Sequence, residues 1–243
     1  MRNESLDFLN MIKNQKSNAR SKTEDRSKVK TTVQEEVKEV SKPLPKKELR
    51  PLTKREEKEL LIAVIDTETN WDDVVMSIGV AIGRASDFKC LEKKYYVFDR
   101  ESRKGGMYSY VLHMRDVPEV VCSRERAMDE IKEYFAQNHI DMLFAYNAKF
   151  DYNHLPELKE YNWYDIMRIA AYKQYNHSIP ETLQFCKTGR LKSDYGVEPI
   201  MKMLSGNRRY SEVHNAVLDA EDELKIVELL KQKIDVYECA RIN

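Results

Sequence analysis

Four carboxylates and one histidine have the residue types and the spacing to build one reactive site. They are Asp66, Glu68, Asp151, His214 and Asp219, spread over three short stretches. Four carboxylates in one cleft would repel one another strongly, so such a set makes sense only around hard divalent cations. Carboxylates with water suit Mg²⁺ or Mn²⁺, and the near absence of Cys and His from the set argues against zinc. Two such ions about 4 Å apart could stabilise both the attacking and the leaving oxygen of a displacement at phosphorus.

The first stretch, LLIAVIDTETN, covers residues 60–70. Its short apolar run, rich in Ile and Val, predicts a buried strand, and residues i and i+2 of a strand point to the same face. Asp66 and Glu68 are therefore expected to project together.

The second stretch begins with an apolar run, and the third stretch begins a helix. MLFAYNAKFD, residues 142–151, delivers Asp151 just after the run ends. HNAVLDAEDELKIVELL, residues 214–230, has apolar residues at helical spacing, which places Asp219 on the first turns of a helix. Five helical residues rotate by roughly 140°, so His214 is expected at the helix entrance, reaching over the site.

The sequences IDTET, NAKFD and HNAVLDA resemble the three motifs of the DEDDh family of 3′ to 5′ exonucleases. That family includes the proofreading subunit of bacterial DNA polymerase III, ribonuclease T and oligoribonuclease. A sister family has tyrosine four residues before the last aspartate, a position that Asn215 holds here. The histidine five residues before it is present as His214, which favours the DEDDh family.

The resemblance implies a mechanism with two divalent ions, Mg²⁺ or Mn²⁺. Asp66 would bridge both ions, and Asp151 would support the second. Glu68 and Asp219 would complete the site that activates water. His214 would act as general base, for which an unperturbed pKa of about 6.5 is suitable. The expected products are nucleoside 5′-monophosphates, released from 3′ ends of single-stranded DNA or RNA.

Several residues beside the motifs are candidates for substrate binding. They are Thr67, Thr69, Trp71, Tyr146 and Asn147. The chain departs from the family pattern at Asn70 and Trp71, which replace a usual glycine, and at Tyr146, which stands where histidine is common. Because an exposed aromatic ring can stack on a terminal base, these departures bear on substrate preference.

Each motif also has a simpler explanation. Acids often follow strands, Asp151 could cap the next helix, and Asp219 could be favourable charge at a helix N-terminus. The order and spacing of all three together favour the nuclease. Two alternatives stay open: a phosphodiesterase specific for oligonucleotides or dinucleotides, and a nucleic-acid-binding module without turnover. The sequence also leaves five properties open: the choice between DNA and RNA, the substrate length, the processivity, the oligomeric state and whether the protein acts together with a polymerase.

The composition predicts a catalytic domain at residues 59–243 and a charged, disordered tail at residues 1–58. Residues 1–59 contain 16 Lys and Arg against 11 Asp and Glu, so the net charge of zero conceals a positive N-terminal part and a negative remainder. A stretch with so few apolar residues cannot offset its ordering entropy. Residues 5–13 could form a short helix that docks on a protein partner.

The order of apolar runs predicts an α/β protein with a ribonuclease H-like, mixed five-stranded sheet flanked by helices. Strands are expected at 60–66, 74–83, 95–98 and 142–145, with a helix at 124–138. A further helix is expected within residues 189–207, closed by Gly206.

The remaining features are less specific. The four cysteines have no paired short spacing, so neither a zinc ribbon nor a disulfide framework is expected. No stretch has the length and apolarity of a membrane span and no cleavable signal is present, so the cytoplasm is the expected location and no membrane partner is expected. His113, His139, His154 and His177 are expected to be solvated or locally paired.

Overall fold

The structure is a computed structural model that describes residues 59–243. The expectations of a charged tail and of a docking helix at residues 5–13 lie outside the described residues. No helix in the described part of the chain is long and apolar enough to cross a membrane.

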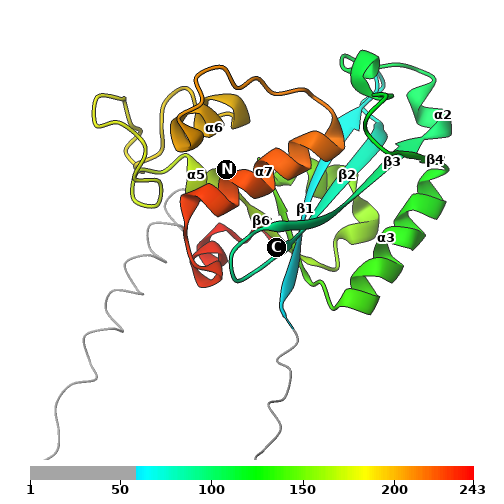
Figure 1. The fold of residues 1–243 in the computed structure, drawn as a ribbon, viewed down its shortest axis with the longest axis horizontal. Coiled ribbons are helices and arrows are strands. Elements are labelled where there is room, and N and C mark those ends of the chain that lie inside the picture. The colour runs from blue at the N-terminus through cyan, green and yellow to red at the C-terminus, as the bar shows by residue number, and fades with distance from the viewer. Residues whose placement is uncertain (1–58) are drawn as a thin grey trace, which may run out of the picture. The chain divides into compact units, whose positions relative to one another are not determined.

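The described chain begins with three consecutive strands, continues with helices between the later strands, and ends in helices (Figure 1). In chain order the elements are β1 (Leu61–Thr69), β2 (Val75–Arg84), β3 (Cys90–Phe98), α2 (Asp99–Ser102), η1 (Ser109–Val111), β4 (Val120–Cys122), α3 (Arg124–Asn138), β5 (Met142–Ala145), α4 (Lys149–His154), η2 (Pro156–Leu158), β6 (Asn162–Asp165), α5 (Met167–Ala170), α6 (Val197–Ser205), α7 (Ala216–Leu230) and η3 (Ile234–Ala240).

The strands form one mixed sheet in the order β4-β3-β2-β1-β5-β6. β1, β2 and β3 pair antiparallel, whereas β5 and β6 continue the sheet in parallel from β1 and β4 lies parallel to β3. The predicted α/β class and mixed sheet are confirmed, but the sheet has six strands rather than five. Edge strand β4 has only three residues, which is too short for an alternating pattern to reveal it.

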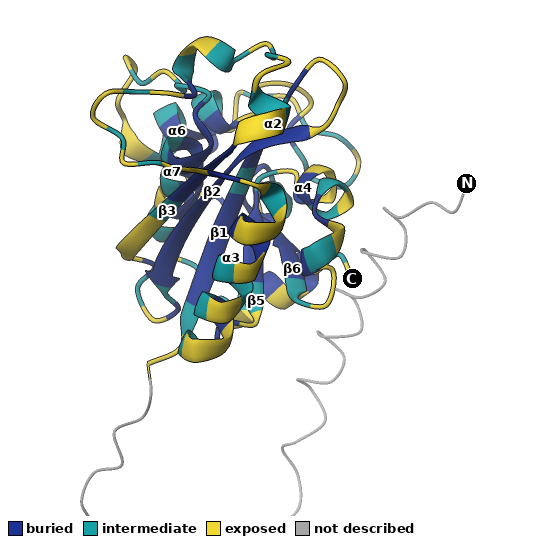
Figure 2. Cartoon of the chain, turned by 90° about the vertical axis from the view of Figure 1, so that its right-hand side faces the viewer, coloured by how far each residue is buried: buried dark blue, intermediate teal, exposed yellow. Residues whose placement is uncertain are grey.

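Helices cover both faces of this sheet, and the central strands between them are buried (Figure 2). Ala63 and Ile65 of β1 pack with Ile131 and Phe135 of α3 in one core cluster. The opposite face of β1 and β2 lies against α7. Successive residues of β1 therefore point to different helical layers, as strand geometry requires.

A glycine in β2 lets α7 approach the sheet closely. A Cβ atom on Gly79 would lie 2.1 Å from the backbone carbonyl carbon of Ala216, the first residue of α7. Gly79 is also the register partner of Asp66 in the β1–β2 ladder. The same glycine thus brings the beginning of α7 next to the acidic end of β1.

Most predicted elements occur where the pattern placed them. The helix at 124–138 is confirmed as α3 with both bounds unchanged, and α6 is followed by Gly206 at φ +71°. Two strands were predicted too short. β3 begins at Cys90 because its first half is polar and exposed, and β1 continues to Thr69, so both motif acids lie within the strand.

Candidate active site

β1 carries two acidic side chains to the face that α7 covers. Asp66 and Glu68 are two residues apart in an extended strand, so they project together as expected. Glu68 is buried, with 8% of its surface exposed, and the Oδ2 atom of Asp66 is buried as well. The strand thus ends in two carboxylates that have little contact with water.

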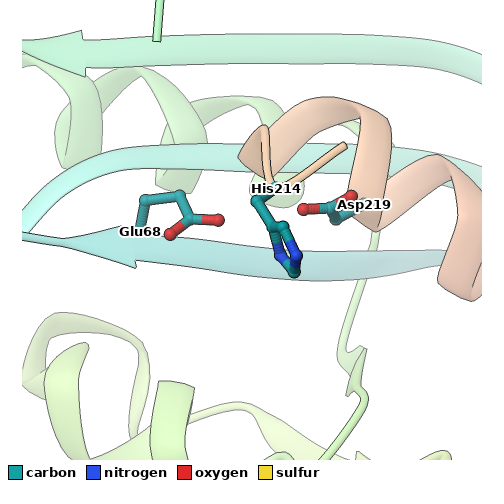
Figure 3. Close-up of side chains that lie close together, drawn as sticks. All are labelled: Glu68, His214 and Asp219. Atoms are coloured by element: carbon teal, nitrogen blue, oxygen red, sulfur yellow. The ribbon is translucent and has the colours of Figure 1, made fainter. Parts of the chain in front are cut away.

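The beginning of α7 brings a histidine and a third carboxylate to the same place. Asn215 precedes the helix, and its carbonyl accepts a hydrogen bond of 2.9 Å from the backbone N–H of Asp219. His214 stands just outside the helix, as expected, with a φ of +62°. Ligand atoms of Glu68, His214 and Asp219 all lie within 4.8 Å of one another (Figure 3).

α4 supplies the fourth predicted carboxylate from the other side of β1. Asp151 is 2% exposed, and its Oδ1 atom accepts a hydrogen bond of 2.7 Å from the hydroxyl of Thr67. Thr67 lies between Asp66 and Glu68 in β1 and points to the opposite face. A single strand therefore presents two acids directly and orients a third through its threonine.

Burial and mutual repulsion make all four carboxylates hard to ionise without a cation. Burial, followed by the negative charge of nearby acids, raises the pKa of Glu68 to about 8 and of Asp219 to about 8. Burial also raises the pKa of Asp151 to about 7, although the hydrogen bond from Thr67 acts in the opposite direction. The pKa of Asp66 is raised well above its usual value, first by burial and then by the charges of Glu223 and Asp151.

Two carboxylate oxygens of this site accept no hydrogen bond from any described protein group. The buried atoms Oδ2 of Asp66 and Oδ1 of Asp219 have no hydrogen-bond partner in residues 59–243. A buried carboxylate oxygen without a donor is costly unless a cation satisfies it. The carboxylate donor set thus fits divalent ions, and oxygen-preferring Mg²⁺ or Mn²⁺ best.

Sequence analysis missed two further acids at this site. Glu223 stands four residues after Asp219, one helical turn along α7, and is 2% exposed. Its Oε2 atom accepts a hydrogen bond of 2.9 Å from the backbone N–H of Tyr146, which ties α7 to the segment leading to Asp151. Glu212 lies two residues before His214, and its negative charge contributes to the raised pKa of Asp219. The i, i+4 spacing was the available signal for Glu223.

No family model matches this sequence, and no curated protein matches it. Solved structures do match the fold. The nuclease domain of 3′hExo, described as a DEDDh family member bound to rAMP, has a TM-score of 0.51 and 11% identity, covering 77% of this chain and 98% of that one. The chain has the same fold as this nuclease domain.

Two further solved structures have a similar fold. A 3′-exonuclease described in 3′-end specific recognition of a histone mRNA stem-loop has a TM-score of 0.52 and 11% identity. The match covers 74% of this chain but only 65% of that one, so this chain spans less than two thirds of that protein. A full-length 3′-exonuclease has a TM-score of 0.51 and 11% identity, with 76% of this chain and 90% of that one covered.

The residues that depart from the DEDDh pattern differ in their surroundings. Trp71 is 69% exposed beside the end of β1. Asn70 is buried, and its Oδ1 atom accepts hydrogen bonds from the backbone N–H groups of Asp72 and Val74, so it shapes the β1–β2 turn. Tyr146 is half-buried, and its hydroxyl donates to the carbonyl of Tyr195. Of the three, Trp71 is the one whose side chain is largely exposed.

The remaining predicted substrate residues lie in three different settings. Thr67 is buried and bonded to Asp151, and Thr69 is half-buried at an irregularity of the β1–β2 ladder. Asn147 is exposed at φ +60°, with its backbone N–H bonded to Oδ1 of Asp165 at 3.1 Å. Asp165 also accepts from the backbone N–H of Met167, the first residue of α5.

The other histidines and the cysteines are not among the ligand atoms that cluster at Glu68, His214 and Asp219. His154 is locally paired, with Nδ1 at 2.9 Å from the carbonyl of Phe150 and Nε2 at 3.2 Å from Oδ1 of Asp73. His113 pairs with Glu119 at 2.8 Å. All four cysteines are free.

The stability of the metal-free protein is expected to fall as pH rises from about 5 to about 8. Unfolded Asp and Glu titrate near 4, whereas Asp151, Glu68 and Asp219 titrate at about 7 to 8 in the folded protein. Between these values the folded state binds more protons than the unfolded state, so the free energy of unfolding decreases with pH. Thermal melts in chelator across this range measure the effect.

Divalent ions should reverse this trend, because they bind the ionised carboxylates. Mg²⁺ or Mn²⁺ is therefore expected to raise the melting temperature more at pH 8 than at pH 5.5. An equal rise at both values would contradict a site built from these acids.

Thr67→Val is expected to weaken metal binding about tenfold, in the range found for residues that orient a metal ligand. Valine keeps the shape of threonine but cannot donate to Oδ1 of Asp151. Calorimetric titration with Mn²⁺ measures the loss. Thr67→Ser retains a hydroxyl and should bind within about twofold of the wild type; equal affinity for all three proteins would show that the hydrogen bond does not orient Asp151.

Proposed function

We propose that this protein is a metal-dependent 3′ to 5′ exonuclease that hydrolyses single-stranded nucleic acid to nucleoside 5′-monophosphates. One observation carries the proposal. β1, α4 and α7 carry four carboxylates whose charges act on Asp66, His214 lies beside Glu68 and Asp219, and two buried carboxylate oxygens there lack any donor in the described chain. The DEDDh fold of the similar 3′-exonucleases supports the same function.

The carboxylates would hold two divalent ions. Asp66, with its unpartnered Oδ2, would be a ligand of these ions together with Glu68 and Asp219. Asp151, which accepts the hydrogen bond from Thr67, would be the fourth carboxylate ligand. Bound ions would supply positive charge that stabilises the oxygens of an in-line displacement at phosphorus.

His214 is suited to accept the proton of the attacking water. Burial lowers the pKa of its imidazole from the usual value, so the neutral form predominates at pH 7. The ring lies beside Glu68 and Asp219, where the water would be held. A neutral imidazole at that position can remove the proton as the water attacks.

The test is digestion of oligonucleotides labelled at their 5′ ends, with Mg²⁺ or Mn²⁺ and with chelator as the control. The expected result is a ladder shortening from the 3′ end, with nucleoside 5′-monophosphates as products. Matched single-stranded DNA, single-stranded RNA and duplexes with mismatched ends reveal the preferred substrate. Intact DNA and RNA with both ions would refute the proposal.

Substrate length is measured in the same assay. A trimming exonuclease would degrade long and short strands at similar rates per end. Turnover that drops steeply beyond a few nucleotides would instead identify a phosphodiesterase specific for short oligonucleotides. Binding without turnover would identify a non-catalytic module.

A further inference from the structure

An aromatic ring from a distant part of the chain lies flat on His214. The rings of Tyr108 and His214 are stacked, with centroids 4.0 Å apart and an interplanar angle of 16°. Tyr108 belongs to the connection between α2 and η1, far from motif residues in sequence. No motif includes it, and sequence analysis did not select it.

This stack is the one directional contact of the imidazole within residues 59–243, where neither ring nitrogen of His214 has a hydrogen-bond partner. A catalytic histidine is usually oriented by a hydrogen bond to its second nitrogen. The backbone of His214 also has a φ of +62°, a conformation that non-glycine residues seldom adopt and that surrounding structure must maintain. The stacked ring of Tyr108 is therefore the contact through which the protein can orient the imidazole.

The segment that carries Tyr108 is anchored to the first motif on its N-terminal side. The carbonyl of Gly105 accepts a hydrogen bond of 3.0 Å from the backbone N–H of Trp71. Gly106 packs so closely that a Cβ atom there would lie 2.4 Å from the carbonyl oxygen of Thr69. Tyr108 thus has a defined position relative to the end of β1.

The same segment is anchored to the third motif on its C-terminal side. The side-chain amide of Asn215 donates a hydrogen bond of 2.7 Å to the carbonyl of Val111. The hydroxyl of Tyr95 donates to the carbonyl of Leu112 at 2.9 Å and accepts from Asn215 at 3.2 Å. Asn215, the neighbour of His214, therefore lies at the start of α7 and is hydrogen-bonded to the segment that carries Tyr108.

We propose that Tyr108 is a positioning residue that holds the imidazole of His214 in its reactive plane through ring stacking. The role rests on the proposed exonuclease function, in which His214 is the general base. Loss of the ring should allow the imidazole to turn away from the attacking water, so the chemical step should slow while substrate binding is retained.

The kinetic test compares Tyr108→Ala, Tyr108→Phe and Tyr110→Ala on a labelled oligonucleotide. Tyr108→Ala is expected to lower kcat roughly tenfold with KM unchanged, because a stacked pair contributes about that factor. Tyr108→Phe keeps the ring and should recover kcat to within about twofold. Tyr110 is 77% exposed two residues further on, and its replacement is the matched control, expected to leave both constants unchanged.

A magnetic-resonance measurement tests the stack without turnover. The ring protons of His214, assigned by their loss in His214→Asn, should lie upfield in the wild type because of the ring current of Tyr108. That shift should vanish in Tyr108→Ala and persist in Tyr108→Phe and Tyr110→Ala. Circular dichroism and thermal melts of each variant verify folding.

Each outcome decides the proposal. An unchanged His214 resonance in Tyr108→Ala shows that no stack exists and overturns it, whatever the activity. A raised KM with unchanged kcat overturns it in favour of a nucleobase platform, and an unchanged kcat and KM shows that the ring has no role. Wild-type protein that digests no substrate would refute the exonuclease function itself, which is visible before any variant is made.

Discussion

Asp66→Asn is expected to lower kcat by at least about a thousandfold and, at the same time, to stabilise the metal-free protein at pH 8. In the proposed function Asp66 is a ligand of the divalent ions, so its loss should remove a metal ligand. Asparagine is nearly the same shape but carries no charge, and an amide is a weak ligand for Mg²⁺ in place of a carboxylate.

The gain in stability follows from the surroundings of Asp66. Its pKa is raised well above the usual value by burial and by the charges of Glu223 and Asp151, so at pH 8 its ionised form is unfavourable in the folded state. A neutral amide avoids this cost, and its NH₂ group can donate to the neighbouring carboxylates. Catalysis and folding therefore place opposite demands on this one side chain.

Steady-state kinetics with Mg²⁺ and thermal melts in chelator measure the two effects on the same preparation. Asp129→Asn is the matched control, because Asp129 is an exposed aspartate on α3 and its replacement should change neither quantity. Substantial activity in Asp66→Asn would exclude the proposed metal site. A lower melting temperature in chelator at pH 8 would show that Asp66 stabilises the fold instead.

His214→Asn is expected to lower kcat about 10² to 10⁴-fold, the usual contribution of a general base. Metal binding should change little, because the carboxylates would remain. The increase in melting temperature on adding Mn²⁺ therefore separates the two roles: it should persist in His214→Asn and disappear in Asp66→Asn.

The pH profile gives a second readout for His214. With His214 as the proposed general base, the neutral imidazole is the active form, so kcat at saturating metal should fall as pH decreases through the pKa of His214. Burial lowers that pKa, so wild-type activity should persist below about 6.5, the usual value for histidine. The acidic decline should be absent in His214→Asn; a variant with full activity and the same profile would show that another group accepts the proton.

The local sequence pattern was enough to predict the position of each acid on its strand or helix. The short apolar run, rich in Ile and Val, that leads into Asp66 and Glu68 predicted a strand with both acids on one face, and the structure has that strand. The spacing in HNAVLDA placed His214 outside α7 and Asp219 inside it, as observed. These predictions succeeded because strand and helix periodicity depend on neighbours in sequence.

The apolar pattern of the sequence did not predict elements, or parts of elements, that are short or polar. β4 has three residues and the first half of β3 is exposed, so neither shows an apolar alternation. Glu223 was overlooked for a related reason, because an acid on a helix is normally solvated. Its burial depends on the packing of α7 against β1 and β2, to which Gly79 contributes.

The sequence by itself determined which side chains are candidates for the reactive groups and the face of each element on which they lie, since both follow from residue type and local periodicity. Only the tertiary structure decided which groups touch. Thr67 orients Asp151, Glu223 binds the backbone of Tyr146, and Tyr108 covers His214. These contacts join residues tens of positions apart, and their geometry depends on how separate elements pack, which no local spacing encodes.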